Sequence, residues 1–127
     1  WKQTWTDAEG NETTSELTRE LIADGAATIN HFESEDGTAI EFCVWLPASG
    51  CMIATGRDAS GNSWELRFNE VTDKHLRGSI CRQTADGKPS RGFFLVTFHG
   101  PGHYTMKRTL FIDGEWATST ADVQRKK

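Results

Sequence analysis

Apolar and polar residues alternate along most of this chain, most clearly between residues 61 and 82. Trp64, Leu66 and Phe68 are each followed by a polar side chain, so one face of an extended segment is apolar and the other is charged. A polar turn at residues 71–74 leads into a second segment in which apolar residues resume. A period of two is typical of a half-buried β-strand, so this stretch predicts two strands joined by a turn.

The same pattern recurs on both sides of this hairpin. Asp-Gly pairs stand at positions 24, 36, 86 and 113, between strand-like segments. A type I′ hairpin turn needs positive φ at both central residues, which Gly accepts freely and Asp tolerates. Residues 93–96 are apolar on both faces, which predicts a strand buried on both faces. The further extended segments are predicted at residues 26–33, 38–46, 51–56, 90–98, 103–112 and 115–124.

Residues 12–23 fit two structures. Leu17 and Leu21 are four residues apart, as on one face of a helix, but Leu17, Arg19 and Leu21 would also share one face of a strand. An Asp-Gly pair follows directly, and another strand-like segment begins at once. The sequence therefore favours the strand.

These segments predict an all-β fold with about ten short strands. Successive strands joined by hairpin turns pair antiparallel, and an up-and-down order closes most naturally into a barrel, which leaves no unpaired edge. The chain contains no linker and no low-complexity run, so residues 1–127 are predicted to form one domain. The predicted fold class is an antiparallel up-and-down β-barrel.

Composition narrows the range of partners. The net charge is −4, with acidic and basic residues interspersed, and the chain has no basic face or run that would bind nucleic acid or an anionic membrane. No apolar run approaches the roughly 20 residues that span a bilayer. A cytoplasmic location is expected, although the chain begins at Trp1 without Met, so a removed signal peptide is the alternative.

The three cysteines, Cys43, Cys51 and Cys81, cannot all pair within one molecule. A tight turn at residues 47–50 would place Leu46 opposite Cys51 and leave Cys43 further along its strand. We therefore expect three reduced thiols, which fits a reducing compartment. The sequence does not say whether any of them is reactive.

A family resemblance covers nearly the whole chain. It is carried by a Trp near the start, by the Asp-Gly punctuation, by GNSWELRF in mid-chain, and by a closing FIDGEW hairpin that ends in VQRKK. In these features the chain resembles the calycin group, which includes lipocalins, fatty-acid-binding proteins and bacterial lipocalin-like domains. It lacks the lipocalin Gly-x-Trp motif and the helical lid of fatty-acid-binding proteins. The resemblance implies a lipocalin-like barrel that binds a small apolar molecule.

Motifs for cofactors or metals are absent. The chain has no glycine-rich nucleotide loop, no Cys-x-x-Cys pair and no His-Glu-x-x-His motif. His99 and His103 are four residues apart, but the Gly-Pro-Gly between them rules out a helix, so we interpret them as solvated turn residues, with a metal or haem site as the alternative. No cofactor and no metal site is predicted.

Arg108 is the most unusual of the candidate ligand-binding residues. Alternation puts it on the same face as Tyr104 and Met106, and a buried guanidinium needs an anion or several acceptors because it does not lose its proton. Fatty-acid-binding proteins hold a carboxylate with an interior Arg–Tyr pair, so the resemblance implies a similar anchor formed by Tyr104 and Arg108 at the floor of a pocket. The alternative is that Arg108 pairs with Asp or Glu, or reaches water near a barrel end.

The predicted function is binding of a small, mostly apolar ligand, either with or without a carboxylate group. Its partner is thus a small hydrophobic molecule, with no nucleic acid and no membrane, and a homodimer is allowed. One alternative is a small barrel enzyme of the cyclase or isomerase type, with Tyr104, His31 or Glu41 as acid–base groups. Another is an interaction domain with a filled barrel. The predicted pocket residues are Phe42, Trp64, Leu66, Phe68, Tyr104, Met106 and Arg108.

Overall fold

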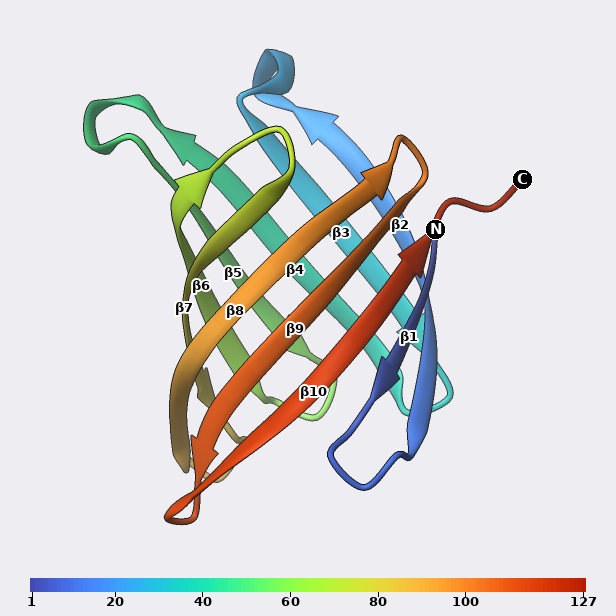
Figure 1. Cartoon of the computed structure of the whole chain (residues 1–127), viewed down its shortest axis with the longest axis vertical. Helices are drawn as coiled ribbons and strands as arrows, with labels where there is room; N and C mark the ends of the chain where they lie inside the picture. Colours follow the sequence, from blue (N-terminus) through green and yellow to red (C-terminus); the bar gives the residue numbers. More distant parts are fainter.

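The computed structural model describes all 127 residues, and its ten strands form one closed sheet (Figure 1). The two helices are three-residue 3-10 turns, Ala23–Gly25 and Pro47–Ser49, and neither has the length to cross a membrane. The strands are β1 (Lys2–Thr6), β2 (Glu12–Ile22), β3 (Ala27–Ser34), β4 (Gly37–Leu46), β5 (Cys51–Asp58), β6 (Ser63–Val71), β7 (His75–Gln83), β8 (Pro89–Gly100), β9 (His103–Ile112) and β10 (Glu115–Gln124).

Every strand pairs antiparallel with its neighbours in the sequence, and β1 closes the barrel by pairing with both β2 and β10. Trp5 lies opposite Thr13 on one side and opposite Ala121 on the other. The predicted all-β, up-and-down antiparallel barrel is therefore confirmed, with ten strands. The strand favoured for the ambiguous N-terminal segment is also confirmed, because β2 covers Glu12–Ile22.

The Asp-Gly turns are of more than one kind. Asp113 and Gly114 have φ values of 53° and 85°, as a type I′ hairpin requires. Asp24 also has positive φ, but inside the 3-10 turn at residues 23–25. The predicted type I′ geometry is wrong for the turns at Asp36 and Asp86, because these two residues do not have positive φ. Ser34 pairs with Gly37, so that Gly belongs to the strand and not to the two-residue turn.

The sheet has one buried face only. Phe94 points into the barrel and is 2% exposed, whereas its neighbour Phe93 is 63% exposed on the outer wall. The prediction that residues 93–96 are buried on both faces is therefore wrong, because a closed barrel has a single interior. At the far end of β4, Leu46 lies opposite Cys51 as predicted, and Cys43, Cys51 and Cys81 are all free.

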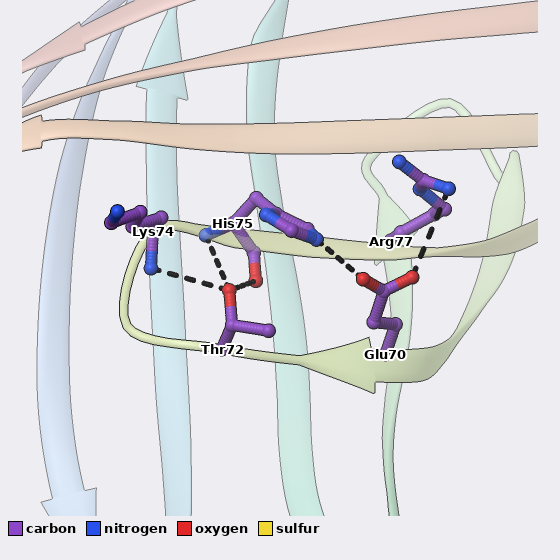
Figure 2. Close-up of polar contacts among 5 residues, drawn as sticks. All are labelled: Glu70, Thr72, Lys74, His75 and Arg77. Carbon is purple, nitrogen blue, oxygen red and sulfur yellow. Dashed lines mark hydrogen bonds and ion pairs between the residues drawn. The ribbon is translucent and has the colours of Figure 1, made fainter.

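The turn between β6 and β7 is held by side chains (Figure 2). The Thr72 hydroxyl accepts hydrogen bonds from the backbone N–H groups of Lys74 (3.2 Å) and His75 (3.0 Å), and it donates to the His75 carbonyl (3.0 Å). Beside the turn, Glu70 contacts the His75 ring at 2.6 Å and Arg77 at 3.8 Å. The hydrogen bond from His75 is the main reason that the pKa of Glu70 lies below its usual value.

The Thr72 hydroxyl gives a direct test of this turn. We expect Thr72→Ala to lower the free energy of unfolding by about 1 kcal/mol, because two backbone N–H groups lose their acceptor. Thr72→Ser keeps the hydroxyl and is expected to lose less than half as much. Urea unfolding of the three proteins checks this, and equal losses in both variants would contradict it.

Candidate functional site

The barrel encloses a cavity of about 630 Å³, which lies within the range of small-molecule sites. A filled barrel would have no such space. Inward-facing residues of β1 to β9 line it, so the cavity runs along the barrel and not through its wall. Six of the seven predicted pocket residues line the cavity: Trp64, Leu66, Phe68, Tyr104, Met106 and Arg108.

The exception is Phe42, and the prediction for this residue is wrong. Phe42 is 43% exposed on the outer wall, whereas its neighbours Glu41 and Cys43 line the cavity. On β4 the large apolar side chains of Ile40 and Phe42 face outward, whereas the carboxylate of Glu41 faces inward, which inverts the usual arrangement. Alternation identifies the two faces of a strand but not which of them is inside.

The apolar part of the interior is contributed mainly by β5 to β9. Phe68 and Phe94 pack edge to face with their ring centroids 4.8 Å apart, a geometry that the quadrupoles of aromatic rings favour. A smaller buried cluster of Leu17, Ala121 and Val123 lies where β1, β2 and β10 meet. The larger core cluster consists of Ala54, Leu66, Phe68, Ile80, Phe94, Val96 and Leu110.

A row of polar side chains crosses the opposite part of the interior. Arg19, Asn30 and Glu41 are opposite one another on β2, β3 and β4. Arg19 Nε donates to Asn30 Oδ1 at 2.8 Å, and Asn30 Nδ2 donates to Glu41 Oε1 at 2.8 Å. The second oxygen of Glu41 accepts a hydrogen bond from Trp64 Nε1, also at 2.8 Å. The inward carboxylate of Glu41 is thus satisfied by neighbouring donors.

Trp64 reaches Glu41 only because the residue between them is Gly56. Gly56 lies opposite Glu41 on one side and Trp64 on the other. A Cβ atom at Gly56 would be 2.3 Å from two ring carbons of Trp64, so the indole passes directly over this backbone. The absent side chain on β5 therefore allows the hydrogen bond between β6 and β4.

Arg108 lies inside the barrel without an acidic partner. Its guanidinium carbon is 4.0 Å from the centroid of the Trp5 ring, and its Nε donates to Ser119 Oγ at 2.7 Å. None of the six ion pairs of the protein involves Arg108. Burial, with the charge of Arg82 as a second cause, lowers the pKa of Arg108 to about 10. The alternative that Arg108 pairs with Asp or Glu is therefore wrong, and its side chain is half-buried against the cavity.

The expected Tyr104–Arg108 pair is not the arrangement found. Both side chains line the cavity, but they are four residues apart along β9. Burial raises the pKa of Tyr104, and the nearby cation that opposes this rise is Arg19, not Arg108. The second cation beside Arg108 is Arg82, whose own pKa is lowered by burial.

Sequence reasoning left Arg82 out of the predicted pocket and did not identify Trp5 or Ser119. The sequence places Arg82 on the same face as Leu76 and Ile80, but near the end of a strand, where a side chain easily reaches water. The register of the Asp113-Gly114 hairpin places Ser119 opposite Arg108, which is a signal that could have identified Ser119. No sequence pattern links Trp5 to Arg108, because only the closure of the barrel brings β1 beside β10. The contact between Trp5 and Arg108 thus depends on tertiary structure alone.

The other candidate groups divide between inside and outside. Of the three acid–base candidates, Glu41 and Tyr104 line the cavity, whereas His31 is exposed on the outer wall. His103 contacts Asp122 at 2.6 Å, and its ring centroid is 4.7 Å from that of His99. No group of three or more His, Cys, Asp or Glu side chains is arranged to hold a metal ion.

Gly56 provides a test of the polar row. We expect Gly56→Ala to displace the Trp64 indole, break its bond to Glu41 and lower the free energy of unfolding by about 2–3 kcal/mol. A blue-shifted or red-shifted Trp emission maximum should accompany the loss. Gly102→Ala is the matched control, because a Cβ atom there meets only the Arg125 Cβ at 3.4 Å. Equal effects of both substitutions would contradict this account.

Arg108 should reduce the stability of the ligand-free protein. Burial lowers its pKa to about 10 on folding, which corresponds to a cost of at most roughly 3–4 kcal/mol. The pKa is lower in the folded state, so the charged guanidinium destabilises the folded protein fully below about pH 10. This destabilisation decreases as the pH rises from there toward the pKa that arginine has in the unfolded chain. Lost contacts to Trp5 and Ser119 offset part of the gain on removal. We expect Arg108→Met to raise the free energy of unfolding by about 1 kcal/mol in urea titrations.

The control is Arg67→Met, because Arg67 is an outer-wall residue whose side chain is 56% exposed. Its effect should stay within about 0.5 kcal/mol. A clear loss of stability in Arg108→Met would mean that Arg108 stabilises the folded protein, which would contradict this prediction.

No family model matches this chain, and no curated protein matches it in sequence.

Proposed function

We propose that this protein binds a small, mostly apolar molecule with an anionic head inside the barrel, as the calycin resemblance of its sequence also suggests. The observation that carries the proposal is Arg108, an inward-facing cation with no carboxylate partner beside a cavity of about 630 Å³. A cation in this position favours a bound anion, because the anion supplies the missing counter-charge.

The walls around Arg108 support an amphiphilic ligand. Fifteen of the cavity-lining residues are hydrophobic, and Phe68, Val96 and Met106 are among them. Apolar walls with a few placed polar groups are typical of sites that bind lipids and similar molecules. Arg108 presents its guanidinium against Trp5, so its orientation is fixed before a ligand arrives.

The proposal is tested by titration with a dansyl-labelled fatty acid, followed by its fluorescence. We expect saturable binding by the wild type, and a loss of affinity of about 10- to 100-fold in Arg108→Met, because a charge-assisted hydrogen bond contributes roughly 1.5–3 kcal/mol. Arg67→Met on the outer wall should bind as the wild type does. The methyl ester of the same probe should not distinguish wild type from Arg108→Met.

Two results would end the proposal. One is the absence of saturable binding of both the acid and its ester to the wild type. The other is equal affinity of wild type and Arg108→Met for the acid, since this would show that the guanidinium does not contact the ligand.

A further inference from the structure

The cavity reaches the connecting loops at one end of the barrel only. Asp36 of the β3–β4 turn and Ser60 and Asn62 of the β5–β6 loop line it, whereas no residue of the loops at the other end does. These two loops lie at the same end (Figure 1). We call this set of three residues the loop mouth.

Arg82 lies on the side of the loop mouth. It is the last residue but one of β7, and the loop that follows β7 touches the mouth, because the Ala85 N–H donates to Asn62 Oδ1 at 3.0 Å. Arg82 makes no ion pair; Asp58 attracts its charge, but both Asp58 oxygens accept hydrogen bonds from Asn62. Arg82 and Arg108 therefore face the same cavity as two cations without a bound acid.

The opposite end of the cavity is apolar and aromatic. Phe98 and Tyr104 have ring centroids 6.2 Å apart, and Trp1 packs against Tyr104 at 5.9 Å. Leu76 lines the cavity at the same end, as the second residue of β7. The one cation there is Arg19, and its Nε is joined through Asn30 to the carboxylate of Glu41.

We propose that an anionic amphiphile enters tail first through the loop mouth, with its head held by Arg82 and Arg108 and its chain directed toward Phe98 and Tyr104. This rests on the proposed function and adds the direction of the ligand. It also names a ligand class, because a head near the mouth can carry a polar extension out of the barrel. Phosphate esters of apolar chains, including phosphodiesters with a polar substituent, fit this arrangement, since arginine binds phosphate oxygens through paired N–H groups.

The test compares two phosphate amphiphiles with the same chain length in displacement of the dansyl fatty acid. Dodecyl phosphate has nothing beyond its phosphate, whereas lauroyl lysophosphatidylglycerol carries a glycerol there. We expect affinities within about threefold of each other, because the added group projects through the mouth. Inorganic phosphate alone should displace nothing, since it lacks the chain.

Variants locate the head. Arg82→Met should weaken both phosphate amphiphiles about tenfold, and Arg82→Lys should weaken them less, because it keeps the charge. Arg77→Met is the matched control on the outer face of the same strand, where the side chain is 60% exposed, and it should have no effect. Arg19→Met should change either affinity by less than about twofold.

The outcomes separate this inference from the proposed function. If the lysophospholipid binds at least about tenfold more weakly than dodecyl phosphate, the head lies in a closed end of the cavity, and the inference is overturned. Weakening by Arg19→Met in place of Arg82→Met would overturn it as well, as would displacement by inorganic phosphate alone. If the dansyl fatty acid binds but neither phosphate amphiphile displaces it, the inference fails and the proposed function stands. If the fatty acid itself does not bind, the proposed function fails.

Discussion

The structure depends on the pairing of one short strand. The five residues of β1 bond to β2 on one side and to β10 on the other, and no other contact between strands closes the sheet. The amino group of Trp1 donates to the Leu17 carbonyl at 2.8 Å, and the Leu17 N–H donates to the Trp1 carbonyl at 2.8 Å, so the pairing extends to the first residue. Closure removes both free edges, which would otherwise be templates for aggregation.

Closure also decides what the interior contains. In a closed sheet with period-two alternation, the parity of one strand fixes that of its neighbours through the register. Trp5 of β1 faces inward, where it lies against Arg108 of β9, and Ser119 of β10 faces inward to accept the Arg108 hydrogen bond. The β1–β10 seam therefore completes the barrel and also brings Trp5 against Arg108, while Ser119 comes from the β9–β10 hairpin.

Much of the fold could be predicted from the sequence, because each strand is encoded by local alternation and each turn by a few residues. The Asp113-Gly114 hairpin and the strand after residue 11 are examples. The facing of β4 could not be predicted, because its apolar side is outward and Phe42 lies on it. Local pattern carries no information about which side of a strand is concave, and only the register across the whole barrel supplies it.

The candidate site shows the same division. The interior position of Arg108 follows from its parity with Met106, which is a local property. Its hydrogen bond to Ser119 joins the two strands of the β9–β10 hairpin, but its contact with Trp5 joins strands from opposite ends of the chain. Trp64 reaches Glu41 across Gly56, which lies on the strand between them. Contacts of this kind depend on closure and on an absent Cβ atom, which alternation alone does not encode.

The three interior arginines are in unequal electrostatic positions, and this inequality is the physical argument for a ligand. Arg19 is joined through Asn30 to Glu41, and Arg82 is attracted by Asp58. Arg108 has only a hydroxyl and an aromatic face, while the second cation acts against it. A fold selected for stability alone would place an apolar residue at this position, since isolated buried charges are costly and well-packed apolar replacements are often more stable. In the proposed function, an anionic ligand supplies the counter-charge that Arg108 lacks within the protein.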